Sequence, residues 1–164
     1  MKEIYENLFV CSQAEFNEMP VDDKTSFAFC AKDPYHKLFV GYKKSLPPDH
    51  PEYLIAKRPE INVISANLID VEKDGFVSDY IINELIQFID DELAKGQRVV
   101  LVCNQGKSRS ASIGLMYMLH KGCFEGYDTF FNVMQAYKEV YPDYEPKFGM
   151  MKATERYWEE CKNG

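Results

Sequence analysis

The residues best suited to chemistry lie in the segment CNQGKSRS, which runs from Cys103 to Ser110. Arg109 stands six positions after the cysteine, and Gly106 lies between them. An apolar run at 98–103 precedes the segment and a helical pattern follows it, so the loop joins a buried strand to a helix N-terminus. Such a terminus presents unpaired N–H groups and the positive end of the helix dipole. We therefore predict a site for a tetrahedral oxyanion such as phosphate.

Each residue type has a part in this chemistry. Gly106 permits a backbone conformation that aims several N–H groups at one point, and Arg109 offers a planar fork for two phosphate oxygens. Thiols in this position ionise readily, so Cys103 is predicted to be a nucleophile, with the Ser110 hydroxyl placed to hydrogen-bond its sulfur. The predicted phosphate-binding loop comprises Asn104, Gln105, Gly106, Lys107, Ser108 and Arg109. This constellation predicts covalent phosphoryl transfer to Cys103.

The run GKS at 106–108 imitates the end of a nucleotide-binding loop. That motif needs a glycine five residues before Gly106, where this sequence has Leu101 inside the apolar run. We therefore reject a nucleotide-binding loop.

The whole chain of 164 residues, 46% apolar and 27% charged, suits one domain over 1–164. A formal charge of −7 argues against a nucleic-acid partner. No apolar run approaches the ~18 residues of a membrane span, and Glu3 and Glu6 interrupt any signal peptide. Five cysteines without a C-x-x-C pair favour neither a disulfide framework nor a zinc site. We expect a cytoplasmic protein without metal or cofactor.

Short apolar runs at 8–11, 26–31, 62–69 and 98–103 are nearly continuous, which is typical of strands covered on both faces of a parallel sheet. Helical patterns occupy 78–95 and 109–120, and two looser stripes follow at 127–137 and 148–161. The order predicts an α/β fold. We expect a central, mostly parallel sheet of about four to five strands flanked by helices, with a helical C-terminal part.

Residues 32–60 are predicted to form a surface excursion within this domain. Over 32–58 the sequence has four prolines and a net charge of +3 from six basic and three acidic residues. The prolines exclude a continuous helix, although KLFVGY at 37–42 could form a short strand. The segment is either a solvated loop or a binding element for an anionic ligand.

The loop CNQGKSRS resembles the signature loop of the cysteine-dependent protein tyrosine phosphatase superfamily, in its compact dual-specificity branch. The similarity extends to ENLFVCSQAEF, SDYIINELIQFIDDELAKGQRVVLVC, ASIGLMYML and FFNVMQAYKEVYP, which together with the loop cover most of the chain outside 32–58. The sequence departs from the branch at Val102, where a histidine usually stands. It also departs at 145–151, where EPKFGMM replaces the usual Pro-Asn-x-Gly-Phe pattern.

The resemblance implies a general acid, an aspartate on a loop upstream of the nucleophile. Asp70 and Asp74 both meet this description in NLIDVEKDGF. We prefer Asp70, because it follows a predicted strand on the sheet edge where Cys103 also ends one. Its role would be to protonate the leaving oxygen and then to activate water.

The sequence thus predicts a phosphomonoester hydrolase of the protein tyrosine or dual-specificity type. Its substrate would be a protein phosphorylated on tyrosine, serine or threonine. A phospholipid or a small phosphorylated molecule is an alternative substrate, because Lys107 and the 32–58 segment are basic. A phosphate-binding module without turnover is the other alternative, which Val102 favours. Sulfur transfer and arsenate reduction are less favoured, because they need a differently ordered fold or a further redox cysteine.

Overall fold

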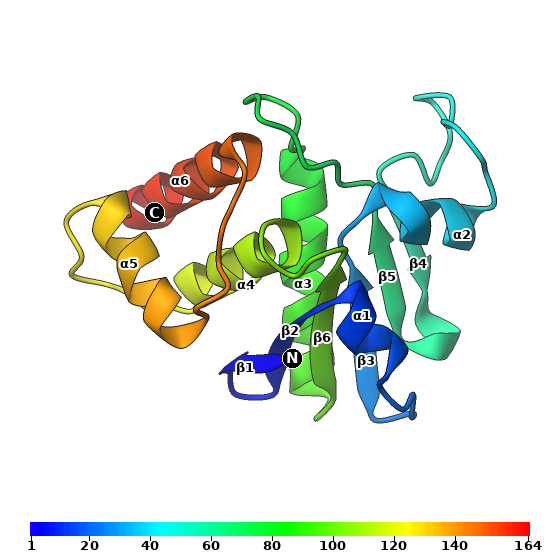
Figure 1. Cartoon of the computed structure of the whole chain (residues 1–164), viewed down its shortest axis with the longest axis horizontal. Helices are drawn as coiled ribbons and strands as arrows, with labels where there is room; N and C mark the ends of the chain where they lie inside the picture. Colours follow the sequence, from blue (N-terminus) through cyan, green and yellow to red (C-terminus); the bar gives the residue numbers. More distant parts are fainter.

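Four parallel strands form the centre of a six-stranded sheet in the computed structural model, which describes all 164 residues (Figure 1). The strands are β1 (Lys2–Tyr5), β2 (Leu8–Ser12), β3 (Thr25–Phe29), β4 (Ile55–Arg58), β5 (Val63–Ala66) and β6 (Arg98–Cys103). Their order across the sheet is β1-β2-β6-β3-β5-β4, and β1 and β4 run antiparallel at the two edges. The predicted α/β class with a mostly parallel sheet is confirmed, with six strands in place of four to five.

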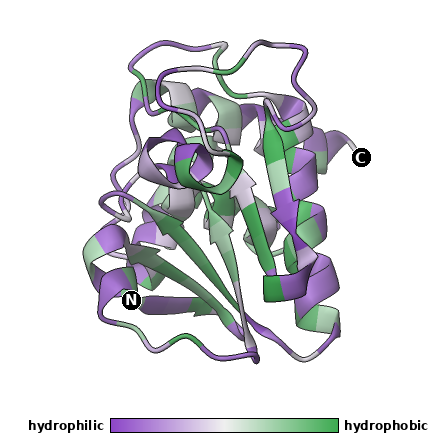
Figure 2. Ribbon diagram, turned by 90° about the vertical axis from the view of Figure 1, so that its right-hand side faces the viewer, coloured by the Kyte–Doolittle hydropathy of each residue, from purple (hydrophilic) through white to green (hydrophobic).

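The apolar runs become the interior strands because both faces of the sheet are covered. Every residue of β3 and β5 is buried, and Arg98 is the only exposed residue of β6. Figure 2 shows these strands as the hydrophobic interior between helices whose outer faces are hydrophilic. The four strands predicted at 8–11, 26–31, 62–69 and 98–103 are thereby confirmed as β2, β3, β5 and β6.

Eight helical segments accompany the sheet. They are α1 (Gln13–Asn17), η1 (Lys32–His36), α2 (Lys37–Val40), η2 (Pro59–Ile61), α3 (Asp79–Ala94), α4 (Arg109–His120), α5 (Phe130–Val140) and α6 (Phe148–Asn163). Helices α3 and α4 pack on one face of the sheet, and α1 lies on the opposite face (Figure 1). Helix α6 packs outside α4, so the predicted helical C-terminal part forms an outer layer.

More of residues 32–60 forms helix or strand than the sequence predicts. KLFVGY does not form a strand: Lys37–Val40 is the short helix α2, which ends at Gly41 with φ +94°. The segment returns to the sheet as the edge strand β4, where Ile55 and Ala56 are buried. Only 41–54 projects from the body, as the upper right loop of Figure 1. No proline lies inside α2 or β4, so the prolines of this segment do not exclude these two elements.

Candidate active site

The predicted phosphate loop connects the central strand β6 to α4. Cys103 is the last residue of β6, only 2% exposed, and Arg109 is the first residue of α4. Gly106 adopts φ +71°, and a Cβ there would lie 3.0 Å from the backbone of Cys11 and Ser12. Only glycine fits both this conformation and the close approach of β2. The loop is therefore folded tightly over the end of the sheet.

The Cys103 sulfur has one polar side-chain partner. Its Sγ lies 3.0 Å from the hydroxyl of Ser110, a buried residue in the first turn of α4. A hydroxyl at this distance can donate a hydrogen bond to a thiolate, and the N-terminus of α4 adds a positive field. The sequence predicted this contact between Cys103 and Ser110, and the structure contains it.

The guanidinium of Arg109 is fixed on one side and free on the other. Its Nη1 donates to the Leu68 carbonyl at 3.0 Å, and its Nη2 donates to the Asn104 side-chain oxygen. Its Nε is buried and has no hydrogen-bond partner. A buried N–H without a partner is costly and therefore uncommon.

The structure separates the two candidate aspartates. Asp70 lines the same pocket as Cys103, and its Oδ1 accepts a hydrogen bond from Ser108 at 2.8 Å. Asp74 lies outside the pocket and pairs with Arg156 of α6 at 2.6 and 2.8 Å. The hydrogen bond from Arg156 holds the pKa of Asp74 below its usual range. Of the two aspartates, only Asp70 lines the pocket that Cys103 also lines.

Sequence reasoning missed residues 145–149, the first three of which line the pocket that Cys103 and Asp70 also line. The backbone N–H of Glu145 donates to the Lys107 carbonyl at 2.8 Å, and that of Lys147 donates to the Ser108 hydroxyl at 3.0 Å. The N–H of Gly149 donates to the Val71 carbonyl at 3.0 Å. These bonds tie both the phosphate loop and the loop carrying Asp70 to the start of α6. The sequence EPKFG at 145–149 could have indicated this contact, because it departs from the pattern that is usual in the branch the sequence resembles.

The site is an open pocket of about 690 Å³. Its charged lining is balanced between four cations and four carboxylates: Lys32, Lys107, Arg109 and Lys147 against Asp33, Asp70, Glu72 and Glu145. The predicted loop residues Asn104, Gln105 and Ser108 also line it. A smaller cavity of about 390 Å³ lies elsewhere, beside Cys123 and Trp158, and contains none of these residues.

Two further thiols lie beside β6: Cys11 on β2 and Cys30 directly after the end of β3. The backbone N–H of Cys30 donates to the Val102 carbonyl at 2.7 Å, and Cys11 stands opposite Val102 in the β2–β6 register. Burial raises the pKa of both thiols, that of Cys11 to about 12. Both are therefore neutral near pH 7, unlike a nucleophilic cysteine. Val102 itself is fully buried and adds no polar group behind the loop.

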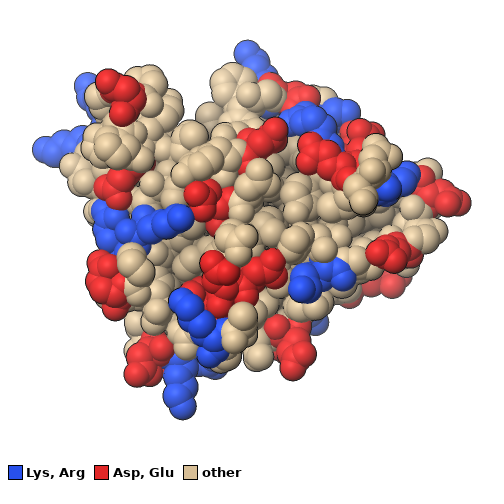
Figure 3. All heavy atoms as spheres, turned by 180° about the vertical axis from the view of Figure 1, so that it is seen from behind, with Lys and Arg blue, Asp and Glu red and all other residues tan.

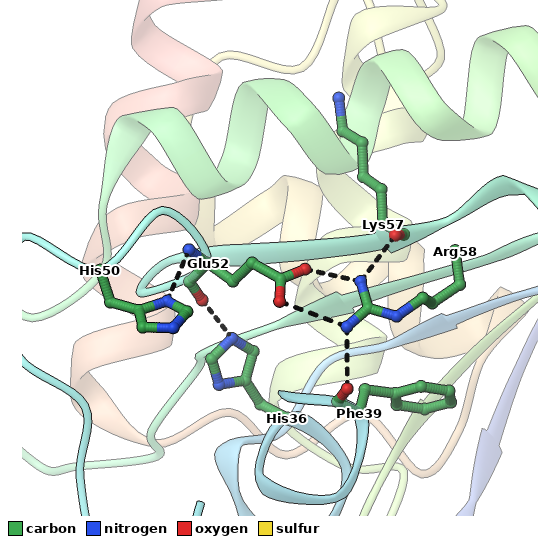
Figure 4. Close-up of polar contacts among 6 residues, drawn as sticks. All are labelled: His36, Phe39, His50, Glu52, Lys57 and Arg58. Atoms are coloured by element: carbon green, nitrogen blue, oxygen red, sulfur yellow. Dashed lines mark hydrogen bonds and ion pairs between the residues drawn. The ribbon is translucent and has the colours of Figure 1, made fainter. Parts of the chain in front are cut away.

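A network of hydrogen bonds holds parts of the 36–58 segment together (Figure 4). The buried ring of His36 contacts the Glu52 carbonyl through Nε2 at 2.8 Å and the Tyr42 hydroxyl through Nδ1 at 2.6 Å. Arg58 donates to both carboxylate oxygens of Glu52, at 2.6 and 3.3 Å, and to the Phe39 carbonyl at 2.8 Å. Because Nε2 faces a carbonyl, it carries the proton, and Nδ1 accepts from Tyr42.

The structure shows no cluster of three or more His, Cys, Asp or Glu side chains that could hold a metal ion. None of its helices is both long enough and apolar enough to cross a membrane.

No protein-family model and no curated protein matches the sequence. Solved structures do match. The chain is similar to a leucine rich repeat and phosphatase domain containing protein from Entamoeba histolytica, with TM-score 0.67 and 11% identity over 99% of this chain and 92% of that one. It is also similar to a human tyrosine phosphatase-like serine/threonine/tyrosine-interacting protein, with TM-score 0.66 and 16% identity over 100% and 98% of the two chains.

Human DUSP28 aligns as well, with TM-score 0.61 and 14% identity over 99% of both chains. These alignments span whole domains, so they confirm the fold that the signature loop implied. The chain has the α/β fold of the dual-specificity and tyrosine phosphatases.

Proposed function

We propose that this protein hydrolyses phosphomonoesters through a phosphocysteine on Cys103. The observation that carries the proposal is one pocket lined by Cys103, Arg109 and Asp70, at the carboxyl ends of the central strands of a phosphatase fold. Ligands of open α/β sheets bind at this edge.

The reaction has two steps. In the first, the Cys103 thiolate attacks phosphorus, the P–S bond forms and the ester P–O bond breaks. Asp70 gives its proton to the leaving oxygen; its Oδ1 is occupied by Ser108, so Oδ2 carries that proton. Arg109 and the loop N–H groups bind the phosphoryl oxygens throughout.

In the second step, water attacks the phosphorus while the Asp70 carboxylate takes a proton from it. The P–S bond breaks, and inorganic phosphate leaves together with the regenerated thiolate. The Ser110 hydroxyl, 3.0 Å from the sulfur, donates to this leaving thiolate and stabilises it.

The substrate class that fits this pocket best is a phosphorylated protein, acted on in the cytoplasm. The balance of four cations and four carboxylates around the site suits one phosphate group better than a highly charged small molecule, although Lys107 at the loop apex adds local positive charge. No metal or organic cofactor takes part in the proposed steps.

The test is hydrolysis of an activated aryl phosphate between pH 5 and 8, with EDTA present. Wild type and Cys123→Ser should turn over, and Cys103→Ser should not. Cys123 is the matched control, because it is a half-buried thiol outside the pocket. Retention of turnover by Cys103→Ser would overturn the proposal.

A second candidate function is phosphate binding without turnover. Val102 favours it, because a buried valine supplies no hydrogen bond to order the loop from behind. This candidate predicts that wild type binds vanadate or phosphate in calorimetry and hydrolyses no aryl phosphate at any pH tested.

A further inference from the structure

A side pocket of about 210 Å³, lined by hydrophobic residues together with Lys32, Ser45, Asn67 and Ser78, adjoins the proposed catalytic pocket. The two cavities share Lys32 and Ile69 in their linings, so one opens beside the other. The side pocket is lined by six hydrophobic residues: Leu46, Tyr53, Leu54, Ile69, Phe76 and Ile81. The catalytic pocket, in contrast, is lined mostly by charged and polar residues.

The side pocket lies between two projecting segments. One wall is the 41–54 loop and the other is the segment that follows Asp70, with Phe76 at its rim. Both rise from the same edge of the sheet (Figure 1), and Figure 3 shows a notch between the two projections at the top of the molecule. The Phe76 side chain is 55% exposed.

The wall formed by 41–54 is held in place. Asn67 donates from its side chain to the Tyr53 carbonyl at 2.8 Å and from its backbone to the Leu54 carbonyl at 2.9 Å. The contacts of His36 and Arg58 to Glu52 anchor the same stretch (Figure 4). The side pocket is therefore preformed, which lowers the entropic cost of filling it.

The volume and charge of this region indicate what fills it. A volume of 210 Å³ is below the ~300–1,000 Å³ of a complete ligand pocket, so it suits one large side chain of a longer substrate. An extended peptide advances only ~3.3 Å per residue, so a residue close to the phosphorylated one reaches the neighbouring cavity. A net charge of −7 disfavours docking on an anionic bilayer.

We propose that the side pocket selects phosphopeptides with a large apolar residue within two positions of the phosphorylated residue. This inference rests on the proposed function and names the substrate class of the same site. The residues that determine specificity are Leu46 and Phe76, one from each wall.

The test compares kcat/KM for phosphotyrosine peptides that carry leucine or aspartate at each flanking position. We expect at least one position at which leucine is favoured about ten-fold or more, because burying such a side chain is worth that factor. Leu46→Ala and Phe76→Ala should each reduce this preference several-fold, and Leu46→Ala should leave aryl phosphate turnover unchanged. Phe131→Ala, which removes an exposed phenylalanine on α5, is the control.

The same peptides are titrated against Cys103→Ser in a binding assay, which does not depend on turnover. If wild type hydrolyses nothing, the proposed function fails, while a leucine preference in binding still supports the side pocket. Equal kcat/KM and equal binding for leucine and aspartate peptides would overturn the inference. So would a Leu46-dependent preference for phosphatidylinositol phosphate vesicles over every peptide.

Discussion

The side chains of the site are held by partners that leave their reactive atoms free. Arg109 is fixed through Leu68 and Asn104 while its Nε has no partner, and Asp70 binds Ser108 through a single oxygen. This preorganisation is what electrostatic catalysis requires, because the donors need not rearrange as charge develops.

Arg109→Lys keeps the charge and removes the planar fork. We expect kcat/KM for an aryl phosphate to fall about 10²–10³-fold, since a lysine cannot offer two parallel donors to one phosphate. Vanadate inhibition should weaken in parallel. Arg98→Lys is the matched control, because Arg98 begins β6, at the opposite end of that strand from Cys103. A loss of less than ten-fold for Arg109→Lys would contradict this role.

Asp70→Asn removes the proton donor and keeps the shape. We expect a small loss with a p-nitrophenyl leaving group and a loss of about 10²–10⁴-fold with phenyl phosphate, whose leaving group needs the proton. Asp74→Asn should leave this dependence unchanged, because Asp74 pairs with Arg156 outside the pocket. Equal losses across leaving groups for Asp70→Asn would count against the acid role.

Local spacing sufficed to predict Cys103, Arg109 and Ser110, because one strand–loop–helix unit holds all three. Spacing alone did not separate Asp70 from Asp74 on the same short loop, and the preference for Asp70 came from its place at the end of a predicted strand. In the structure, Asp74 pairs with Arg156, which is remote in sequence. Lys147 was missed for the same reason, since its contact with Ser108 crosses the molecule.

At the scale of elements, the start of α6 positions the loop that carries Asp70. A Cβ at Gly149 would lie 2.6 Å from the Lys73 carbonyl oxygen and 2.9 Å from that of Val71. Both contacts are to backbone, so the side chains cannot relieve them and the loop itself must shift.

Gly149→Ala should therefore lower both the free energy of unfolding, by about 1–3 kcal/mol, and kcat. Urea unfolding and aryl phosphate kinetics measure the two effects. Gly114→Ala is the comparison, because its Cβ would meet the flexible end of Ile4 at 2.5 Å, far from this loop. It should cost stability and spare kcat. If Gly149→Ala kept full kcat, α6 would not position Asp70.

The network around His36 makes the fold sensitive to acid. Burial lowers the pKa of His36, so the unfolded chain takes up a proton below about pH 6.5 while the folded chain does not. The free energy of unfolding should therefore fall as pH drops from 7 to 5, by at most about 1.4 kcal/mol per pH unit from this group. The Arg58 hydrogen bond lowers the pKa of Glu52, so its contribution is lost only at lower pH.

Urea unfolding of wild type and His36→Gln at pH 7, 6 and 5 measures this effect. The variant should be less stable at pH 7 and should show a shallower decline toward pH 5. His50→Gln, which changes the half-buried neighbouring histidine, should keep the wild-type decline. The same decline in His36→Gln would show that another group titrates.

The interior elements could be predicted because burial on both faces leaves continuous apolar runs. The edge strands β1 and β4 could not, since each has one neighbour and exposes charged residues such as Lys2, Glu3 and Lys57. Helix α1 has only five residues and buries none of them, so it leaves no apolar period. KLFVGY reads as a strand because α2 is a single turn, too short to show a helical period.

At the scale of the whole molecule, three remote segments meet at one end of the sheet. They are the loop after β5, the loop between β6 and α4, and residues 145–149. The parallel sheet brings the first two together, because the carboxyl ends of its strands share an edge. The third arrives only through the packing of α6 on α4, which no local pattern reveals. Structures with only 11–16% identity share this fold, so the fold depends on topology more than on particular side chains.

The most direct test of the central claim is to find where the phosphoryl group resides during turnover. Wild type is mixed with an aryl phosphate, quenched in denaturant within milliseconds, and analysed by intact mass and peptide mapping. A single added phosphoryl group on the sulfur of Cys103, absent in Cys103→Ser, is the predicted result. Continued turnover with no phosphoenzyme at any quench time and no burst of released phenol, or a phosphoryl group on a different residue, would contradict the account.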